Sequence, residues 1–314
     1  NLIFALCLGI ASFFFGRNVI KVKQNINLGR DIDRSDRPRD RWMTMARVAL
    51  GQSKMVVRPV AGILHILIYV GFVIINIEVL EIVIDGLIGT HRVFAFMGAF
   101  YSFLIGSFEI LAFLVLLACV LFMIRRNVLQ IKRFVMQEMK GWPKLDANLI
   151  LIFEVVLMSA FLLMQGADLA LQNLGADHYV KAGSFPISSF LLPLFDGMSI
   201  EAIVIIERVC WWFHILGILA FLNYLPYSKH FHIIMAFPNT YFSNLEPKGS
   251  FTNMASVKNE VQMMMDPNAD PYATPSKVDA EDPGRFGAKD VNDLNWVQLM
   301  NAYSCTECGR CTSE

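Results

Sequence analysis

Residues 60–75 read VAGILHILIYVGFVII, an apolar run that contains a single histidine, His65. The run continues to about 56–85, and a helix that spans a bilayer needs about 20 mostly apolar residues. Four further stretches have the same character, at about 1–20, 101–124, 147–171 and 200–225. The sequence therefore predicts an all-α membrane protein built on a five-helix transmembrane bundle.

The composition supports this fold class. Hydrophobic residues make up 55% of the chain and charged residues 17%, whereas a soluble domain has about a quarter charged residues. The formal net charge is zero, so no overall positive charge attracts nucleic acid. We expect membrane lipid, and not nucleic acid, around the bundle.

Loop charges orient the bundle. The segments 17–58 and 125–144 together hold seventeen Lys and Arg residues, whereas 86–100 and 172–200 hold one each. Basic loops stay on the cytoplasmic side. The pattern predicts a protein of the bacterial inner (cytoplasmic) membrane, with its N-terminus outside and the tail after Tyr227 cytoplasmic. Five buried helices of a soluble protein would not explain this alternation.

Two histidines lie within predicted spans. At 1.5 Å per residue, His65 lies roughly 10–16 Å and His214 roughly 18 Å from the cytoplasmic edge. Their similar depth on antiparallel helices suits axial ligation of one haem, and Gly62 and Gly217 nearby would let a porphyrin approach the backbone. The chain has no C-x-x-C-H motif, so this haem would be b-type. Alternatively, each histidine bonds a neighbouring helix.

A second haem nearer the cytoplasm is suggested by His230 and His232. Met55 lies at the start of the second apolar stretch, at a depth similar to these histidines, and methionine can ligate haem iron. Pro226 is expected to end the fifth helix before these residues. The alternative is that both histidines join Lys229 in a basic cluster at the lipid headgroups.

Two of the acidic residues inside the spans are candidates for proton transfer. Glu109 and Asp168 either move protons from a quinol or pair helices. Arg208 follows Glu207 directly and would neutralise either this carboxylate or a haem propionate. His91 and His178 fall in outer loops. We expect them to be ordinary surface residues, and the alternative is that either one faces a quinone. The carboxylates in or near the spans are Glu78, Glu81, Glu109, Glu154, Asp168 and Glu207.

Three cysteines form the clearest motif of the chain. Cys305, Cys308 and Cys311 match the first part of the C-x2-C-x2-C-x3-C-P pattern of [4Fe–4S] ferredoxins, whose fourth cysteine would fall at position 315. We expect the iron–sulfur domain to continue beyond this sequence. Zinc and disulfide bonding are the alternatives, but zinc sites usually pair two C-x2-C units and disulfides are uncommon in the cytoplasm.

These features divide the chain into three parts. Residues 1–232 form a transmembrane cytochrome b domain, and 233–292 form a cytoplasmic linker whose later part is rich in Pro, Asp, Asn and Gly and is expected to be irregular. Residues 293–314 begin an iron–sulfur domain, with a short helix expected over 293–303 before the cysteines.

Three segments carry a family resemblance: RPVAGILHILIYVGF (58–72), WWFHILGILAFLNYLPYSKHFH (211–232) and YSCTECGRCTSE (303–314). Together they resemble the cytochrome b subunit of respiratory nitrate reductase fused to a heterodisulfide-reductase-like iron–sulfur domain. The same fusion of two domains occurs in membrane proteins that pass electrons between electron-transfer flavoprotein and menaquinone.

The resemblance implies two haems held by four histidines on helices two and five. His65 and His214 match the ligands of the haem nearer the outer face. For the other haem, His232 fits by spacing better than His230. Met55 stands where the family has its fourth histidine, which departs from the pattern.

The resemblance also implies a function. The chain would pass electrons between menaquinone, haem b and cytoplasmic iron–sulfur clusters, with the quinone reacting in the outer half of the bundle. The expected soluble partner is an electron-transfer flavoprotein or a cysteine-rich iron–sulfur subunit. Two alternatives remain: a quinol-oxidising subunit for a heterodisulfide-reductase-like thiol/disulfide enzyme, and a redox-silent membrane anchor or transporter.

Overall fold

The computed structural model describes residues 1–129, 131–247, 249–250, 255–266 and 288–313. In this part of the chain five helices are long and apolar enough to cross a membrane. The prediction of an all-α membrane protein with five spanning helices is confirmed. These helices are α1 (Leu2–Ile26), α3 (Pro59–Ile88), α4 (Ala99–Asn127), α5 (Trp142–Leu174) and α6 (Ile200–Tyr224).

Local sequence signals set where these helices begin and end. Proline occupies the first turn of α3 and of α5, where its missing N–H costs no helical hydrogen bond. Gly89 and Gly175 end the same two helices at φ values of 87° and 67°, which glycine adopts without steric cost. Ser199 caps α6 by accepting a hydrogen bond from the Ala202 N–H.

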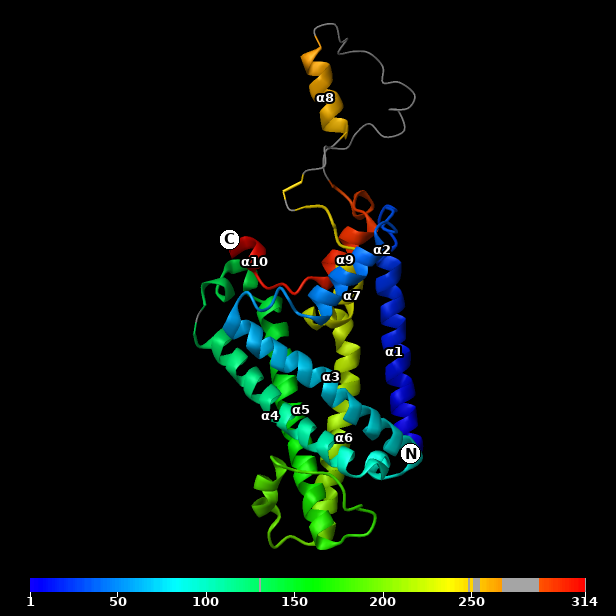
Figure 1. The fold of residues 1–314 in the computed structure, drawn as a ribbon, viewed down its shortest axis with the longest axis vertical. Coiled ribbons are helices and arrows are strands. Elements are labelled where there is room, and N and C mark those ends of the chain that lie inside the picture. The colour runs from blue at the N-terminus through cyan, green and yellow to red at the C-terminus, as the bar shows by residue number, and fades with distance from the viewer. Residues whose placement is uncertain (130, 248, 251–254, 267–287, 314) are drawn as a thin grey trace.

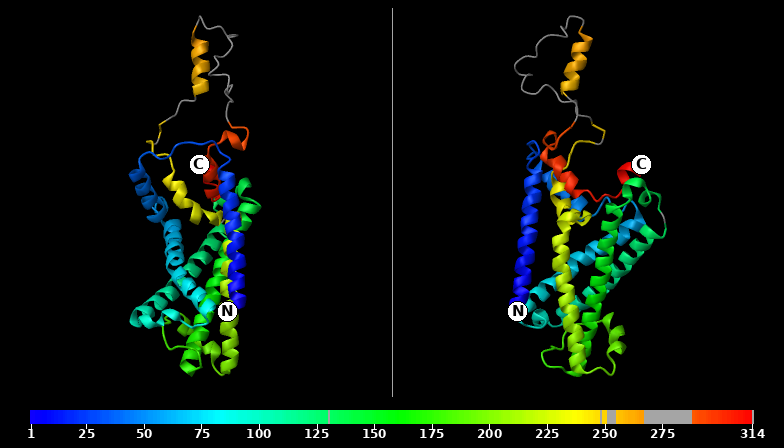
Figure 2. Two further views of the ribbon diagram at one scale, coloured as in Figure 1. Left: turned by 90° about the vertical axis from the view of Figure 1, so that its right-hand side faces the viewer. Right: turned by 180° about the vertical axis from the view of Figure 1, so that it is seen from behind.

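The helices pack as a bundle in which α3 lies against α4, α4 against α5, and α5 against α6 (Figure 1). Helix α1 contacts α6 and α3, and much of its apolar surface remains exposed. Helices α3 and α4 are inclined to the long axis of the bundle, whereas α1, α5 and α6 run nearly along it (Figures 1 and 2). The fully buried core includes Ile105, Phe108, Phe161 and Ile215.

Two glycines allow close helix contacts inside the bundle. A Cβ atom at Gly217 of α6 would lie 2.5 Å from Leu157 Cδ2 of α5, and one at Gly71 of α3 would lie 2.4 Å from Val115 Cγ2 of α4. Small residues at helix interfaces let backbones approach, and dispersion contacts then stabilise the pair in a membrane.

The two ends of the bundle differ. The cysteine end, which carries Cys305–Cys311, is built from short helices, and the distal end carries Asn1 and the connections after α3 and α5. At the distal end these connections contain η2 (Val93–Met97) and η5 (Ser188–Phe195). The elements at the cysteine end are α2 (Pro38–Met45), η1 (Ala46–Leu50), η3 (Lys132–Phe134), η4 (Gln137–Met139), η6 (Leu225–Tyr227), η7 (Lys229–Phe231), α7 (His232–Tyr241), η8 (Val291–Asp293), α9 (Trp296–Ser304) and α10 (Arg310–Ser313).

The connection between α1 and α3 holds these short helices together. Arg41 is almost fully buried and donates hydrogen bonds to the carbonyl oxygens of Tyr241, the last residue of α7, and of Ser243 just beyond it. The indole N–H of Trp296, at the start of α9, donates to the Ile32 carbonyl at 3.1 Å. Segments more than 190 residues apart in the sequence are therefore joined by hydrogen bonds at this end.

The segment after His232 is more helical than expected. The prediction of an irregular stretch is wrong over α8 (Ala255–Met265), and α7 also lies within the predicted linker. Helix α7 forms because its apolar face packs on α9 and α2. The short helix before the cysteines is confirmed as α9, while residues 267–287 lie outside the described residues.

Replacing Gly217 with leucine should destabilise the bundle. The new side chain overlaps Leu157, and overpacking typically costs about 1–3 kcal/mol. Thermal unfolding of the detergent-solubilised protein should show a lower midpoint for Gly217→Leu. Gly16→Leu on α1 is the matched control, because apart from its chain neighbours and its own helix backbone no described atom lies within 4 Å of its Cβ position. Equal midpoints for the two variants would contradict the packing role of Gly217.

Candidate functional site

Three histidines meet near the cysteine end. His65 lies in the second turn of α3, His230 lies in η7, and His232 is the first residue of α7. The ring centroids of His65 and His232 are 6.4 Å apart, and those of His230 and His232 are 5.7 Å apart. We call these three residues the histidine cluster.

The histidine cluster fits axial ligation of a metal. Imidazole nitrogens bind metals at about 2 Å, so two rings on one ion have centroids about 6 Å apart. His232 Nδ1 lies 2.9 Å from the Lys229 carbonyl oxygen, and this contact places the proton on Nδ1 and leaves Nε2 free. His65 Nδ1 is buried and has no hydrogen-bond partner in the part of the chain that the structure describes.

A haem needs only two protein ligands at its iron, whereas a metal ion held by the protein alone needs more. No group of three or more His, Cys, Asp or Glu residues within the described part of the chain is arranged to hold an ion. Burial lowers the pKa of His230 to about 3, with the neighbouring His232 and His65 adding to the shift, and burial also lowers the pKa of His232. Both rings are thus held neutral, the form that binds metals.

His214 lies apart from this cluster. It is 1% exposed, its Nδ1 is 3.0 Å from the Leu157 carbonyl oxygen of α5, and its ring packs on Phe161. As for His232, this hydrogen bond leaves Nε2 as the free nitrogen. The described ring contacts bring His65 to His232, and the pairing of His65 with His214 stays a prediction.

The sequence argument estimated the membrane depth of each histidine by counting residues along its helix. Two features explain why that count did not predict the contact between His65 and His232. Helix α3 is inclined, so its residues gain less depth than 1.5 Å each (Figure 1). As expected from Pro226, α6 ends before His230, and the chain then turns through η6 and η7. This turn carries His232 back to α3.

Met55 does not lie on the second spanning helix, and Gly62 and Gly217 do not face a space for a porphyrin. The second spanning helix begins only at Pro59, and Met55 lies half-buried in the turn before it. A Cβ atom at Gly62 would lie 2.5 Å from the Met55 carbonyl oxygen, while Gly217 faces Leu157. Protein atoms, and not an open space for a porphyrin, therefore face both glycines.

Lys229 connects the histidine cluster to the cysteine motif. Its Nζ donates to the Pro143 carbonyl at 2.7 Å and lies 3.6 Å from the Glu307 carboxylate, between Cys305 and Cys308. Its backbone N–H donates to Asp146 at 2.9 Å. The turn that carries His230 and His232 is thus in direct contact with residues 305–311, which we call the cysteine loop.

The cysteine loop has an environment suited to thiolate ligands. Cys305 and Cys311 are exposed and Cys308 is half-buried. Burial opposes the charged form of Cys308, but hydrogen bonds within the loop and the charges of Arg133 and Arg310 lower its pKa below the ordinary thiol value. Iron–sulfur clusters bind cysteine as the thiolate, so these residues fit the group.

A second site lies at the distal end. A cavity of about 310 Å³, which we call the distal cavity, lies among α3, α5, α6 and the first turn of α1. Its size is that of a small-molecule pocket. Apolar walls come from Phe4, Met164, Trp211 and Trp212, and polar walls from Glu78, Glu81, Asp85, His91, Arg92, Gln165, Asp168, His178, Glu207 and Arg208.

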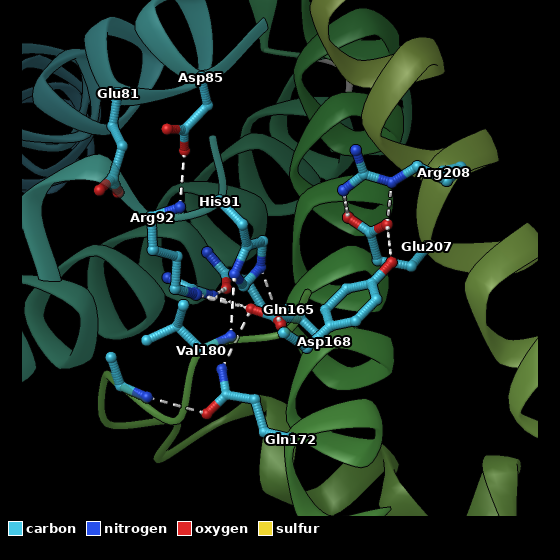
Figure 3. Close-up of polar contacts among 12 residues, drawn as sticks. Glu81, Asp85, His91, Arg92, Gln165, Asp168, Gln172, Val180, Glu207 and Arg208 are labelled. Carbon is cyan, nitrogen blue, oxygen red and sulfur yellow. Dashed lines mark hydrogen bonds and ion pairs between the residues drawn. The ribbon is translucent and has the colours of Figure 1, made fainter. Parts of the chain in front are cut away.

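Arg92 is the centre of a buried polar network beside this cavity (Figure 3). It is 8% exposed and forms an ion pair with Asp168, with Nε 2.7 Å from Oδ2. It also donates to Gln165 at 2.6 Å and to the Tyr101 hydroxyl at 3.0 Å. His91 Nε2 lies 3.2 Å from the other Asp168 oxygen, so the connection between α3 and α4 is fixed to α5.

Sequence reasoning counted Arg92 only as a loop charge. Burial disfavours its charge, but the facing Asp168 and other acidic groups raise its pKa above the ordinary value. Its backbone has φ = 53°, a conformation that is rare without glycine and is concentrated at functional sites. A signal was present, because Arg92 directly precedes the apolar residues 93–97, where a solvated loop would be polar.

The other acidic residues have identifiable partners. Glu109 accepts hydrogen bonds from the Ile187 and Ser188 N–H groups, at 2.9 and 3.1 Å, and so fixes the connection before η5 to α4. Arg208 forms an ion pair with Glu207, which agrees with the expectation from their adjacency.

Comparisons with known proteins found two curated relatives. The chain is 27% identical over 314 residues to "Probable iron-sulfur-binding oxidoreductase FadF" of Bacillus subtilis. It is 23% identical over 290 residues to "EtfAB:quinone oxidoreductase" of Syntrophomonas wolfei. These alignments cover 99% and 90% of this chain, but only 39% and 35% of the relatives, so the chain spans less than half of their length. No family model and no solved structure matches the sequence.

Replacing Arg92 with methionine should destabilise the fold strongly. The substitution leaves Asp168 buried without its main cationic partner, and breaking a buried pair in this way costs about 3–5 kcal/mol. The thermal midpoint in detergent should fall well below that of the wild type. Arg37→Met is the control: Arg37 and its partner Asp40 are 46% and 52% exposed, so losing this surface ion pair should change the midpoint little. Similar midpoints for both variants would contradict a central role for Arg92.

Proposed function

We propose that this chain is the membrane part of an oxidoreductase that passes electrons between menaquinone, haem b and iron–sulfur clusters. The observation that carries the proposal is the contact through Lys229 between the histidine cluster and the cysteine loop. Candidate ligands for two kinds of redox group are thereby adjacent, at the edge of a five-helix membrane bundle.

In this proposal His65, His214 and His232 would hold the haem groups. The ring separation of 6.4 Å supports His65 and His232 as one pair, near the cysteine loop. His214 presents its free Nε2 deeper in the bundle and is the candidate ligand of a second haem. When bound, haem supplies a centre that accepts and returns one electron at a time. His230 packs against the ring of Phe221 and is in contact with His232, and so positions the cluster.

The cysteine loop would supply three thiolates to a [4Fe–4S] cluster, with the fourth ligand from residues beyond position 314. The name of the Bacillus subtilis relative supports this assignment, since that protein is called iron-sulfur-binding. The second relative's name includes a quinone and EtfAB, which supports an electron-transfer flavoprotein as the soluble partner.

The distal cavity is the proposed quinone site. Trp211 lines it and precedes His214 by three residues, a rise of about 4.5 Å along α6. Met164 lines it from α5, three residues after Phe161, which touches His214. Aromatic walls suit the quinone ring, and Arg92 and the nearby histidine side chains can donate to its carbonyl oxygens.

Loop charges support the orientation of this proposal. The cysteine end bears the basic connections and would face the cytoplasm, so the flavoprotein would deliver electrons there. The electrons would then pass through the bundle to the distal cavity at the outer face, where menaquinone is reduced.

Single histidine variants of the full-length protein test the haem ligands. We expect two haems per chain in the wild type, with His65→Ala and His232→Ala each losing the same haem and His214→Ala losing the other. Haem content and reduced-minus-oxidised spectra measure these losses. His178→Ala, at the exposed surface, should retain both haems.

The same variants test the alternative pairing. If His65→Ala and His214→Ala remove one common haem that His232→Ala retains, the pairing implied by the family resemblance is correct and ours is wrong. A purified wild type without any b-type spectrum after haem loading would refute the haem assignment and favour the redox-silent anchor.

Cysteine variants test the iron–sulfur assignment. In the full-length protein Cys308→Ser should lower the iron and acid-labile sulfide content by one cluster, because a thiolate ligand is lost. Cys119→Ser is the matched control, since Cys119 is buried in α4 far along the chain from the motif. Unchanged iron and sulfide content in Cys308→Ser would refute the assignment.

A further inference from the structure

We propose that Glu78 exchanges a proton with the quinone in the distal cavity, and that the Asp168–His91 pair connects this cavity to the distal surface. The inference rests on the proposed quinone site and names the residues that perform its proton chemistry.

Glu78 has a carboxylate oxygen without a hydrogen bond in the buried interior, where an unpaired polar atom is energetically unfavourable. It is 3% exposed on α3 and lines the distal cavity. One of its oxygens accepts a hydrogen bond from the Gln165 side chain, and the other, Oε2, has no hydrogen-bond partner among the described residues. Buried polar groups are nearly always paired, and ionisable residues inside spanning helices usually mark a transport or reaction path.

The other carboxylates of the cavity are already engaged. Glu81 accepts from the Phe94 N–H and from the Tyr101 hydroxyl, at 2.9 and 2.8 Å. Asp168 faces Arg92 and His91. Asp85 accepts from Thr90 and from the backbone N–H groups of residues 92 and 93, and Glu207 pairs with Arg208 and accepts from Tyr179. Asp168 Oδ1 also lacks a hydrogen bond but faces His91 Nε2 at 3.2 Å. Among the described residues that line the cavity, Glu78 therefore has the carboxylate oxygen with neither a hydrogen bond nor an ion pair, and it is left for a substrate proton.

The reaction step balances as follows. Reduction of a quinone to a quinol adds two electrons, which the proposed electron-transfer chain supplies, and two protons, one to each carbonyl oxygen. The O–H bond of the protonated Glu78 carboxyl breaks as a new O–H bond forms on one quinone oxygen. The second proton comes from solvent at the mouth of the cavity, and a further solvent proton restores Glu78.

Histidine side chains mark the route to solvent. His91 Nε2 lies 3.2 Å from Asp168, and its ring is 5.9 Å from that of His178. His178 lines the cavity and is exposed, so the cavity reaches the distal surface beside it. Imidazole groups relay protons at ordinary pH. Protons therefore enter at the end opposite to the cysteine loop, where the electrons enter.

Haem reduction by menadiol, a soluble naphthoquinol, tests Glu78 in the reverse direction. In the haem-loaded full-length protein, Glu78→Gln should slow this reduction about 100-fold, the usual range for losing a general acid–base group. Glu78→Asp should recover at least a tenth of the wild-type rate. The control Glu154→Gln removes a carboxylate from a spanning helix outside the cavity and should leave the rate unchanged.

Menadione binding separates proton exchange from simple structural damage. Quenching of tryptophan fluorescence, to which Trp211 and Trp212 of the cavity wall contribute, should give the same dissociation constant for the wild type and Glu78→Gln. A wild-type rate of haem reduction in Glu78→Gln, or loss of menadione binding in that variant, would overturn the inference. Failure of menadiol to reduce the haem of the wild type would instead overturn the proposed quinone site itself.

Discussion

Every charge inside this apolar bundle requires a partner, because an unpaired ion costs several kcal/mol away from water. Arg92 shows how this constraint shapes the distal end: pairing it with Asp168 fixes the connection after α3 to α5 and forms one wall of a cavity. Lys229 has the same effect at the cysteine end, where Asp146 and Glu307 face it. The two ion-pair networks close the bundle at opposite ends, and both candidate sites are built on them.

His232 lies beside the Lys229 network, and His214 lies between the two networks on α6. Their Nδ1 atoms show how a backbone carbonyl can prepare a ligand: His214 uses Leu157 and His232 uses Lys229. Each contact fixes one ring nitrogen and leaves the other free, which is the arrangement that supports metal-binding histidines generally. The same helix, α6, carries His214 and the cavity residue Trp211, so a ligand in the cavity would lie close to a redox centre at His214.

The proposed division of labour follows from this layout. Electrons enter beside the cysteine loop, whose surroundings include the basic side chains of Arg133 and Arg310 that favour thiolate ligands. Protons enter at the other end, through a cavity lined by carboxylates and histidines. A bundle whose middle is apolar keeps the two routes separate, since an electron can cross it between buried centres but a proton requires a polar path.

The sequence by itself determined the five spans, the helix before the cysteines and the motif C-x2-C-x2-C, because these depend on residues that are close together along the chain. It also identified the histidines as candidates by their type. Only the tertiary structure decided that His65 lies beside His232, that Arg92 is buried, and that Glu78 keeps a free oxygen. These facts depend on the inclination of α3 and on contacts between residues distant in sequence, and apolar periodicity carries no information about either.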